Sequence, residues 1–180
     1  RLGIYVDSVY NNAESHNGST LILATIFFSF QVYCDFSGYA DIAIGSAKVL
    51  GFNLMENFRR PLFAKTTGEH WKRWHISLSS WFKDYLYFPM GGSRVSTQRL
   101  YFNLMVVFAL SGLWHGANWT FIIWGSLNGF YLVFALLIKK YKDKLNTFSG
   151  IEKFPRFHLF QQIVVTFLLI SFSRIFFRAN

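Results

Sequence analysis

The sequence predicts an all-α fold of polytopic transmembrane helices. Of its 180 residues, 52% are hydrophobic and only 15% are charged, a balance that soluble domains rarely reach. The apolar residues also form long runs: residues 121–138 carry no charge, and residues 158–177 contain Arg174 as their only firmly charged member. A helix needs about 20 apolar residues to cross a bilayer. Both runs are therefore candidate membrane spans, at 121–138 and 158–177.

Residues 20–50 form the first expected membrane segment. They are apolar as far as Asp35, and Asp41 follows beside a second apolar stretch. The sequence fits either one long helix or two helices joined near Ser37 and Gly38. The chain opens with Arg and ends directly after a span, so we expect a piece of a larger membrane protein, with residues 1–180 inside a single membrane domain.

Residues 69–85 are predicted to form an amphipathic helix at the membrane interface. At 100° per residue, six apolar side chains fall within an arc of roughly 120°, and Ile76 is the exception. The six are Trp71, Trp74, Leu78, Trp81, Phe82 and Tyr85. Tryptophans on one face, with lysine and arginine on the other, are typical of a helix that lies in the headgroup plane.

Residues 101–117 and 121–138 are predicted to form a membrane hairpin. The first stretch is apolar only to Leu113, and two glycines, an asparagine and a tryptophan then interrupt the pattern between 112 and 119. Irregular backbone at membrane depth is tolerated only where protein or a water-filled cavity surrounds it. We therefore expect the turn at residues 114–118 to line a cavity.

The distribution of charge predicts on which side of the membrane the loops lie. Residues 59–99 hold eight Lys and Arg against two acids, and residues 139–156 hold six against two. Basic loops favour the cytoplasmic side, so both blocks are expected there. One block precedes the predicted hairpin and the other follows it. Because the basic residues flank hydrophobic spans, they indicate topology and contact with membrane lipid, and no nucleic-acid partner is expected. One cysteine, Cys34, excludes an internal disulfide and a multi-cysteine metal site.

Two histidines are candidates for chemistry. His115 lies at the interruption of the hairpin, and an ionisable residue at membrane depth is a functional hypothesis by default. Its near-neutral titration also suits proton transfer. The alternative is a structural histidine that bonds to Asn118 or to a carbonyl in the turn. His75 lies inside the apolar arc of residues 69–85, where it is either functional or a buried histidine satisfied by a carbonyl.

Three blocks of the sequence resemble bacterial alginate O-acetyltransferase-type members of the membrane-bound O-acyltransferase family. They are QVYCDFSGYADIAIGSAKVLGF at 31–52, NFRRPLFAKTTGEHWKRWHISLSSWFKDYLYFPMGG at 57–92 and LSGLWHGANWTFIIWGSLNG at 110–129. The resemblance implies that residues 1–180 belong to one catalytic membrane domain whose helices surround a central tunnel. The family's invariant histidine maps to His115, and its second characteristic histidine maps to His75.

The resemblance also implies a reaction and its participants. We expect a multi-pass protein of the bacterial inner membrane that moves an acetyl group from a cytoplasmic thioester, with acetyl-CoA as the first choice, to hydroxyls of an extracytoplasmic polysaccharide. Transfer is either direct or through a periplasmic acetyltransferase partner. No bound cofactor or metal is expected. Alternatives are D-alanyl transfer to teichoic acid, a non-enzymatic transporter and a non-catalytic membrane subunit.

The expected catalytic residues are His115 as general base and His75 in donor positioning or proton relay. The candidate substrate-binding residues fall into two groups: Trp114, Asn118 and Trp119, which would shape the cavity and supply an oxyanion donor, and the cations Arg59, Arg60, Lys72 and Arg73, which would attract the donor's phosphates. The same cations serve equally well as a topology signal.

Overall fold

The computed structural model describes residues 2–179, and the chain divides into two compact units, Arg1–Asn57 and Phe58–Asn180. Within residues 2–179 the regular structure consists of helices, with a single isolated bridge between Phe58 and Trp74 and no strand. The predicted all-α fold is therefore confirmed.

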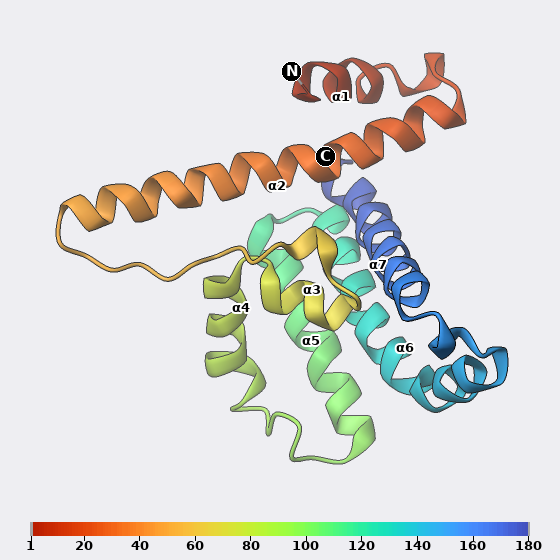
Figure 1. The fold of residues 1–180 in the computed structure, drawn as a ribbon. Helices are drawn as coiled ribbons and strands as arrows, with labels where there is room; N and C mark the ends of the chain where they lie inside the picture. The colour runs from red at the N-terminus through yellow and green to blue at the C-terminus, as the bar shows by residue number, and fades with distance from the viewer. Residues whose placement is uncertain (1, 180) are drawn as a thin grey trace. The chain divides into compact units, whose positions relative to one another are not determined.

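The first unit is a pair of helices. α1 (Leu2–Tyr10) is followed by the short 3₁₀ helix η1 (Ala13–Ser15) and by α2 (Gly18–Val49), and α1 folds back along the N-terminal part of α2 (Figure 1). The Tyr10 hydroxyl lies 2.8 Å from the Thr25 hydroxyl and joins the two helices. α2 continues without a break through residues 37 and 38, so the structure has the single long helix and not the jointed pair.

The second unit begins with short elements. η2 (Pro61–Phe63), α3 (Thr67–Arg73), α4 (Ile76–Phe82) and the π-helical turn η3 (Lys83–Tyr87) follow one another. The predicted continuous helix over residues 69–85 is therefore wrong, because it is interrupted at Trp74 and His75. The backbone of residues 73–74 pairs with residues 58–59 instead of continuing the helix: the Arg59 N–H donates to the Arg73 carbonyl at 2.9 Å.

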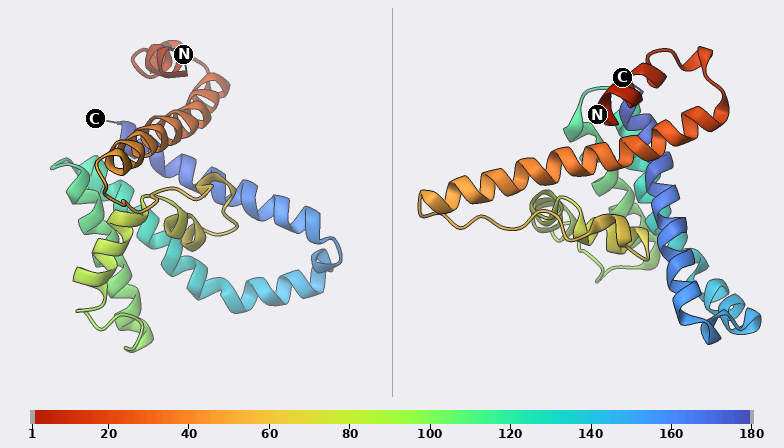
Figure 2. Two further views of the ribbon diagram at one scale, coloured as in Figure 1. Left: turned by 60° about the vertical axis from the view of Figure 1, so that its left-hand side comes forward. Right: turned by 45° about the horizontal axis from the view of Figure 1, so that its top comes forward.

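The predicted hairpin is present as α5 (Thr97–His115) and α6 (Trp119–Ser149), which lie side by side in Figures 1 and 2. Two glycines set how closely the helices approach. A Cβ on Gly125 would overlap the Phe108 carbonyl oxygen and would meet the Gly112 Cα at 3.0 Å. Asn118 ends the turn, since its side chain accepts from the Thr120 N–H at 3.1 Å and caps α6.

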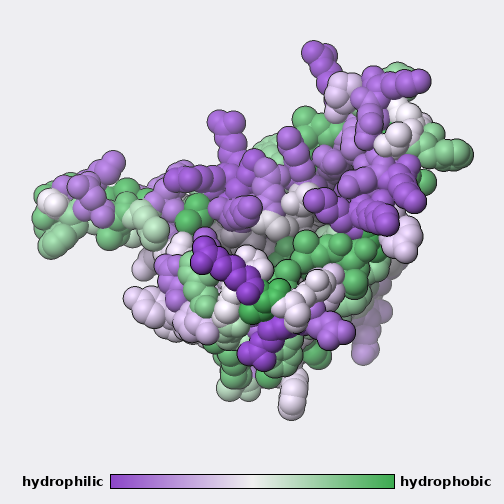
Figure 3. All heavy atoms as spheres, turned by 90° about the horizontal axis from the view of Figure 1, so that it is seen from below, coloured by the Kyte–Doolittle hydropathy of each residue, from purple (hydrophilic) through white to green (hydrophobic). Residues whose placement is uncertain are grey.

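α7 (Pro155–Arg178) follows the short η4 (Ile151–Lys153) and packs against α6 and α3. α6 runs to Ser149, so much of the basic block at 139–156 is helical and was not foreseen as such. Three described helices are long and apolar enough to cross a membrane, namely α2, α6 and α7, and α5 is not one of them. Apolar patches lie among hydrophilic side chains on the face viewed in Figure 3. Large apolar side chains of the long helices, such as Phe130, Phe134 and Phe172, are exposed.

Candidate functional site

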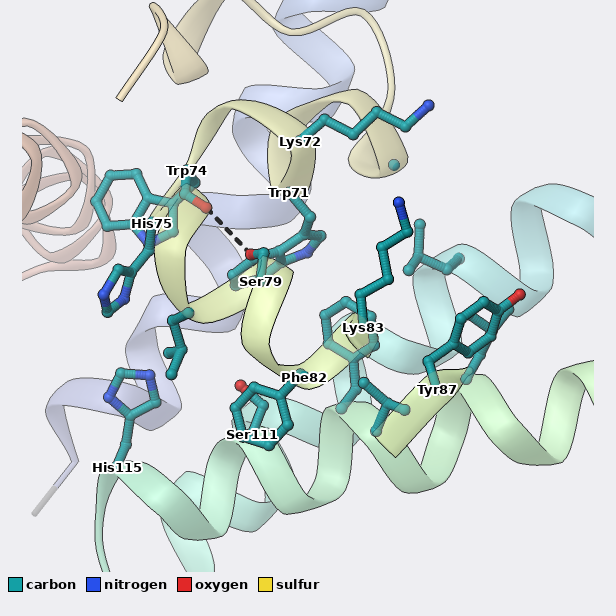
Figure 4. A pocket seen from close by; sticks show the side chains of 16 residues that line it. Trp71, Lys72, Trp74, His75, Ser79, Phe82, Lys83, Tyr87, Ser111 and His115 are labelled. Atoms are coloured by element: carbon teal, nitrogen blue, oxygen red, sulfur yellow. Dashed lines mark hydrogen bonds between the residues drawn. The ribbon is translucent and has the colours of Figure 1, made fainter. Parts of the chain in front are cut away.

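A cavity of about 260 Å³ lies within the second unit, between the segment α3–η3 and the α5–α6 hairpin (Figure 4). Its walls are mainly apolar, and they include Leu78, Phe82, Leu104, Val107, Phe108 and Leu132. Polar groups are few: His75, His115, Ser79, Ser111, Lys72, Lys83 and Tyr87 complete most of the lining. An apolar cavity with a few convergent polar groups is the usual form of a small-molecule site.

The two candidate histidines lie at one end of this cavity. His115 is the last residue of α5, and His75 immediately precedes α4. Figure 4 shows that the two imidazole rings face one another. Trp114 lies beside both, with its ring centroid 5.0 Å from that of His115 and 6.3 Å from that of His75. Residues 40 positions apart in the sequence thus meet at one point.

Aromatic rings surround the His115 imidazole. Its ring centroid lies 5.1 Å from that of Trp124 on α6 and 5.3 Å from that of Phe177 on α7, and both contacts are edge-to-face. His115 thereby joins the ends of three helices. The apolar rings exclude water from part of the imidazole, and polar interactions are stronger where water is excluded.

The backbone of His75 has an unusual conformation. Its φ of 46° and ψ of 57° lie in the left-handed region, which costs a residue with a side chain about 1–2 kcal/mol. The preceding residue, Trp74, is held on both sides: its backbone pairs with Phe58, and its carbonyl accepts from the Ser79 hydroxyl at 3.3 Å. The strain turns the chain sharply, and a strained residue beside a cavity suggests a functional constraint.

Burial keeps His70 and His75 uncharged at neutral pH. Burial lowers the pKa of His75 below its ordinary value, so its imidazole is uncharged at neutral pH. His70 is almost fully buried, and burial, together with the Arg174 charge, lowers its pKa to about 3. The His70 Nδ1 lies 3.0 Å from the Pro61 carbonyl oxygen. Since a carbonyl only accepts, Nδ1 carries the proton.

Two lysines line the cavity away from the histidines. Figure 4 shows the Lys72 and Lys83 side chains on the opposite side of the cavity from His75 and His115, with Tyr87 beside Lys83. Both lysines are exposed, and the Lys83 ammonium lies 5.2 Å from the centre of the Phe88 ring. The cavity therefore has a cationic end, an apolar middle and an end with two imidazoles.

Comparison with known proteins identifies the family. The model of the membrane-bound O-acyltransferase family matches residues 4–177. The chain belongs to this family. It is 43% identical over 158 residues to the probable alginate O-acetylase AlgI of Pseudomonas aeruginosa. These residues are 88% of this chain and 28% of that protein.

Two other relatives of this family member are a second O-acetyltransferase and a D-alanyltransferase. The peptidoglycan O-acetyltransferase of Helicobacter pylori is 38% identical over 176 residues, 98% of this chain and 32% of that protein. The teichoic acid D-alanyltransferase of Bacillus subtilis is 29% identical over 153 residues, 81% of this chain and 38% of that protein. The chain thus spans about a third of the length of these curated relatives.

The structure brings some predicted site residues of this family member together and leaves others apart. His75, His115 and Lys72 line the cavity, and Trp114 adjoins both histidines without lining it. The other five are not in the cavity wall. Arg59 and Arg60 are exposed, Arg73 pairs with Glu69 at 2.7 Å, Asn118 caps α6, and Trp119 is 76% exposed.

Several residues that line the cavity were missed from the sequence. Ser111 lies one helical turn before His115, and this i, i+4 spacing was a signal that could have placed it on the same face. Lys83 was assigned to the polar face of the predicted helix over residues 69–85, and Tyr87 lies beyond the end of that helix. Their shared position at the cavity depends on the π-helical turn η3, for which the sequence carries no simple signal.

Proposed function

We propose that this chain is part of the catalytic core of an inner-membrane O-acetyltransferase, which transfers an acetyl group from a cytoplasmic thioester to hydroxyls of an extracytoplasmic, alginate-like polysaccharide. The observation that carries the proposal is the meeting of His75 and His115 at one end of a single cavity. Acyl transfer needs a group that takes a proton from a hydroxyl and returns one to the leaving thiolate, and an imidazole does both near neutral pH.

The shape of the cavity supports a thioester donor. Acetyl-CoA has an anionic phosphate end and a long, weakly polar arm that ends in the thioester. The cationic end formed by Lys72 and Lys83 suits the phosphates, the apolar walls suit the arm, and the thioester carbon would then lie near the two imidazoles. The lysines act here as attractive charges, because the exposed ammonium groups can follow a mobile phosphate.

The proposed reaction assigns one proton acceptor. A nitrogen of His115 removes the proton of the acceptor hydroxyl as its oxygen attacks the thioester carbonyl carbon. The C–S bond then breaks, and the protonated imidazole returns the proton to the departing thiolate. His75 orients the thioester or relays the proton, a role that fits its neutral state and its position facing His115.

The names of the relatives support a polysaccharide as the acceptor. The relatives at 43% and 38% identity carry the names alginate O-acetylase and peptidoglycan O-acetyltransferase, whereas the teichoic acid D-alanyltransferase is 29% identical. This order favours acetyl transfer to a polysaccharide over D-alanyl transfer. A periplasmic partner that receives the acetyl group before the polymer is compatible with the same site.

The substitution His115→Gln in the intact protein tests the proposal. Glutamine keeps much of the volume and the hydrogen-bonding capacity but cannot accept a proton at neutral pH. General-base catalysis contributes about 10²–10⁴-fold to a rate, so we expect release of CoA from acetyl-CoA, and acetylation of the polymer, to fall by at least about 100-fold.

The matched control is His158→Gln, because His158 lies at the start of α7 outside the cavity wall and contacts Gln162. This variant should acetylate normally. Near-normal activity of His115→Gln, in protein inserted at the wild-type level, would remove His115 from the mechanism and leave His75 as the leading candidate. Activity with a D-alanyl thioester in place of acetyl-CoA would favour the alternative substrate.

A further inference from the structure

We propose that Arg174 is a positioning residue, which holds the His75 imidazole toward His115 by stacking on Trp74. This inference rests on the proposed function of His75 and His115 and adds to it a residue from α7 that lies outside the cavity wall.

Arg174 is a buried cation in an apolar helix. Its exposed fraction is 6%, and it lies within the candidate membrane span α7. A cation there is costly unless specific partners compensate it, which is why such residues usually have a function. The guanidinium carbon lies 4.6 Å from the centre of the Trp74 ring. This is a cation–π distance, and such contacts are strongest for an arginine over a tryptophan in a desolvated site.

The Trp74 ring is enclosed by side chains from three segments. The His70 ring stacks on it with centroids 5.7 Å apart and planes at 16°, and the Phe58 ring meets it edge-on at 5.0 Å. Trp74 itself is 8% exposed. His70 is in turn fixed by its hydrogen bond to the Pro61 carbonyl. The indole is thus a fixed point that connects α7 with the segment leading into the cavity.

Trp74 is the residue directly before His75. Because His75 has left-handed backbone angles, the direction of its side chain depends on the peptide between the two residues, and that peptide is held from the Trp74 side. A movement of the indole would be transmitted to the imidazole with no flexible residue between them. Small displacements of this kind are costly, since a misplacement of about 1 Å can reduce a rate by about 100-fold.

The substitution Arg174→Lys separates charge from stacking, because lysine keeps the positive charge but lacks the planar group that stacks on an indole. In membranes containing the intact protein, we expect kcat for acetyl transfer from acetyl-CoA to fall by about 10- to 100-fold, with KM for acetyl-CoA unchanged. In a Trp74→Leu background the same change should cause no further loss, because both substitutions remove one interaction.

A second measurement does not depend on activity. Diethyl pyrocarbonate modifies exposed, neutral imidazoles, and mass spectrometry gives the rate at each histidine. We expect His75 to react faster in Arg174→Lys and in Trp74→Phe than in the wild type. The exposed residue Arg156, at the start of the same helix, supplies the control Arg156→Lys, which should change neither kcat nor the modification rate.

The inference is overturned if Arg174→Lys keeps the wild-type kcat, if the losses from Arg174→Lys and Trp74→Leu multiply, or if the reactivity of His75 is unchanged. Its failure is distinct from that of the proposed function. Inactive His115→Gln beside a fully active Arg174→Lys would refute only the positioning role. Active His115→Gln would refute the catalytic assignment, whereas the modification rates would still report whether Arg174 positions His75.

Discussion

His75 illustrates how one backbone conformation can shape a site. A left-handed residue between α3 and α4 reverses the side-chain direction that a continuous helix would give, and it brings the imidazole to the cavity end that His115 also reaches. Glycine or asparagine adopts this conformation more easily than histidine. The presence of histidine there suggests that the imidazole is needed for its chemistry, since its backbone preference does not favour the position.

The stability of the protein should depend on the protonation of His70. Its folded pKa is about 3, below the ordinary value of 6.5, so between these pH values the unfolded chain binds a proton that the folded protein excludes. No penalty exists above pH 6.5, and stability falls as the pH decreases from there toward 3. At pH 5 the expected loss is on the order of 2 kcal/mol.

Thermal unfolding of the purified intact protein in detergent, between pH 7.5 and 5, measures this dependence. In His70→Gln the midpoint should fall less over the same range, even if it starts lower at pH 7.5. An equally steep slope in His70→Gln would show that other groups cause the acid sensitivity.

Residue chemistry could be predicted from the sequence where a side chain is unusual in its surroundings. His115 stood out as an ionisable residue at a break between apolar segments, and the family resemblance singled out His75. Arg73 was placed among the substrate-binding cations, although Glu69 lies four residues before it and pairs with it in α3. The i, i+4 rule could have indicated that pairing. The catalytic roles themselves stay predictions.

At the scale of elements, the long helices and the hairpin could be predicted because their signals are local in the sequence. Apolar runs indicate the helices, and glycines indicate the turn. The interruption of residues 69–85 could not. Its cause is the pairing of residues 73–74 with 58–59, about fifteen positions earlier, and a periodic pattern contains no information about such a partner. Tertiary contacts overrode a pattern whose hydrophobic spacing suited a helix.

The α5–α6 hairpin should be sensitive to a single methyl group at Gly125. A Cβ there would overlap the Phe108 carbonyl oxygen, which belongs to backbone and cannot rotate away. We expect Gly125→Ala to destabilise the protein by about 1–3 kcal/mol, the usual cost of overpacking. The thermal midpoint in detergent and the amount of protein in membranes measure the effect.

Gly38→Ala provides the comparison, because a Cβ at Gly38 in α2 meets no atom within 4 Å. Alanine favours a helix over glycine, so this variant should be as stable as the wild type or more stable. If Gly125→Ala were equally harmless, α5 and α6 would have to tolerate a wider separation than the glycine contact indicates.

At the scale of the whole molecule, the α5–α6 hairpin predicts which segments lie on the same side of the membrane. Position 94 precedes α5 and position 142 lies late in α6, so an antiparallel hairpin places both at the same end. In a Cys34→Ser background, single cysteines at Arg94 and Lys142 should both react with an impermeant maleimide from the cytoplasmic side of sealed vesicles. The basic residues near both positions support that side.

A cysteine introduced at Asn118, in the turn between α5 and α6, is the internal comparison, and it should not share the cytoplasmic accessibility of the other two. Labelling of positions 94 and 142 from opposite sides would contradict the hairpin as the arrangement in the membrane.

Because of the π-helical turn η3, the lining of the cavity depends on the number of residues in this segment. A π turn closes its hydrogen bond over five residues where an α turn closes over four, and Lys83 and Tyr87, the first and last residues of this turn, both reach the cavity. Removal of one residue would return the segment to ordinary helix and would change which of its side chains reach the cavity. The number of residues between His75 and Tyr87, as well as their identity, is therefore constrained by the cavity that they enclose.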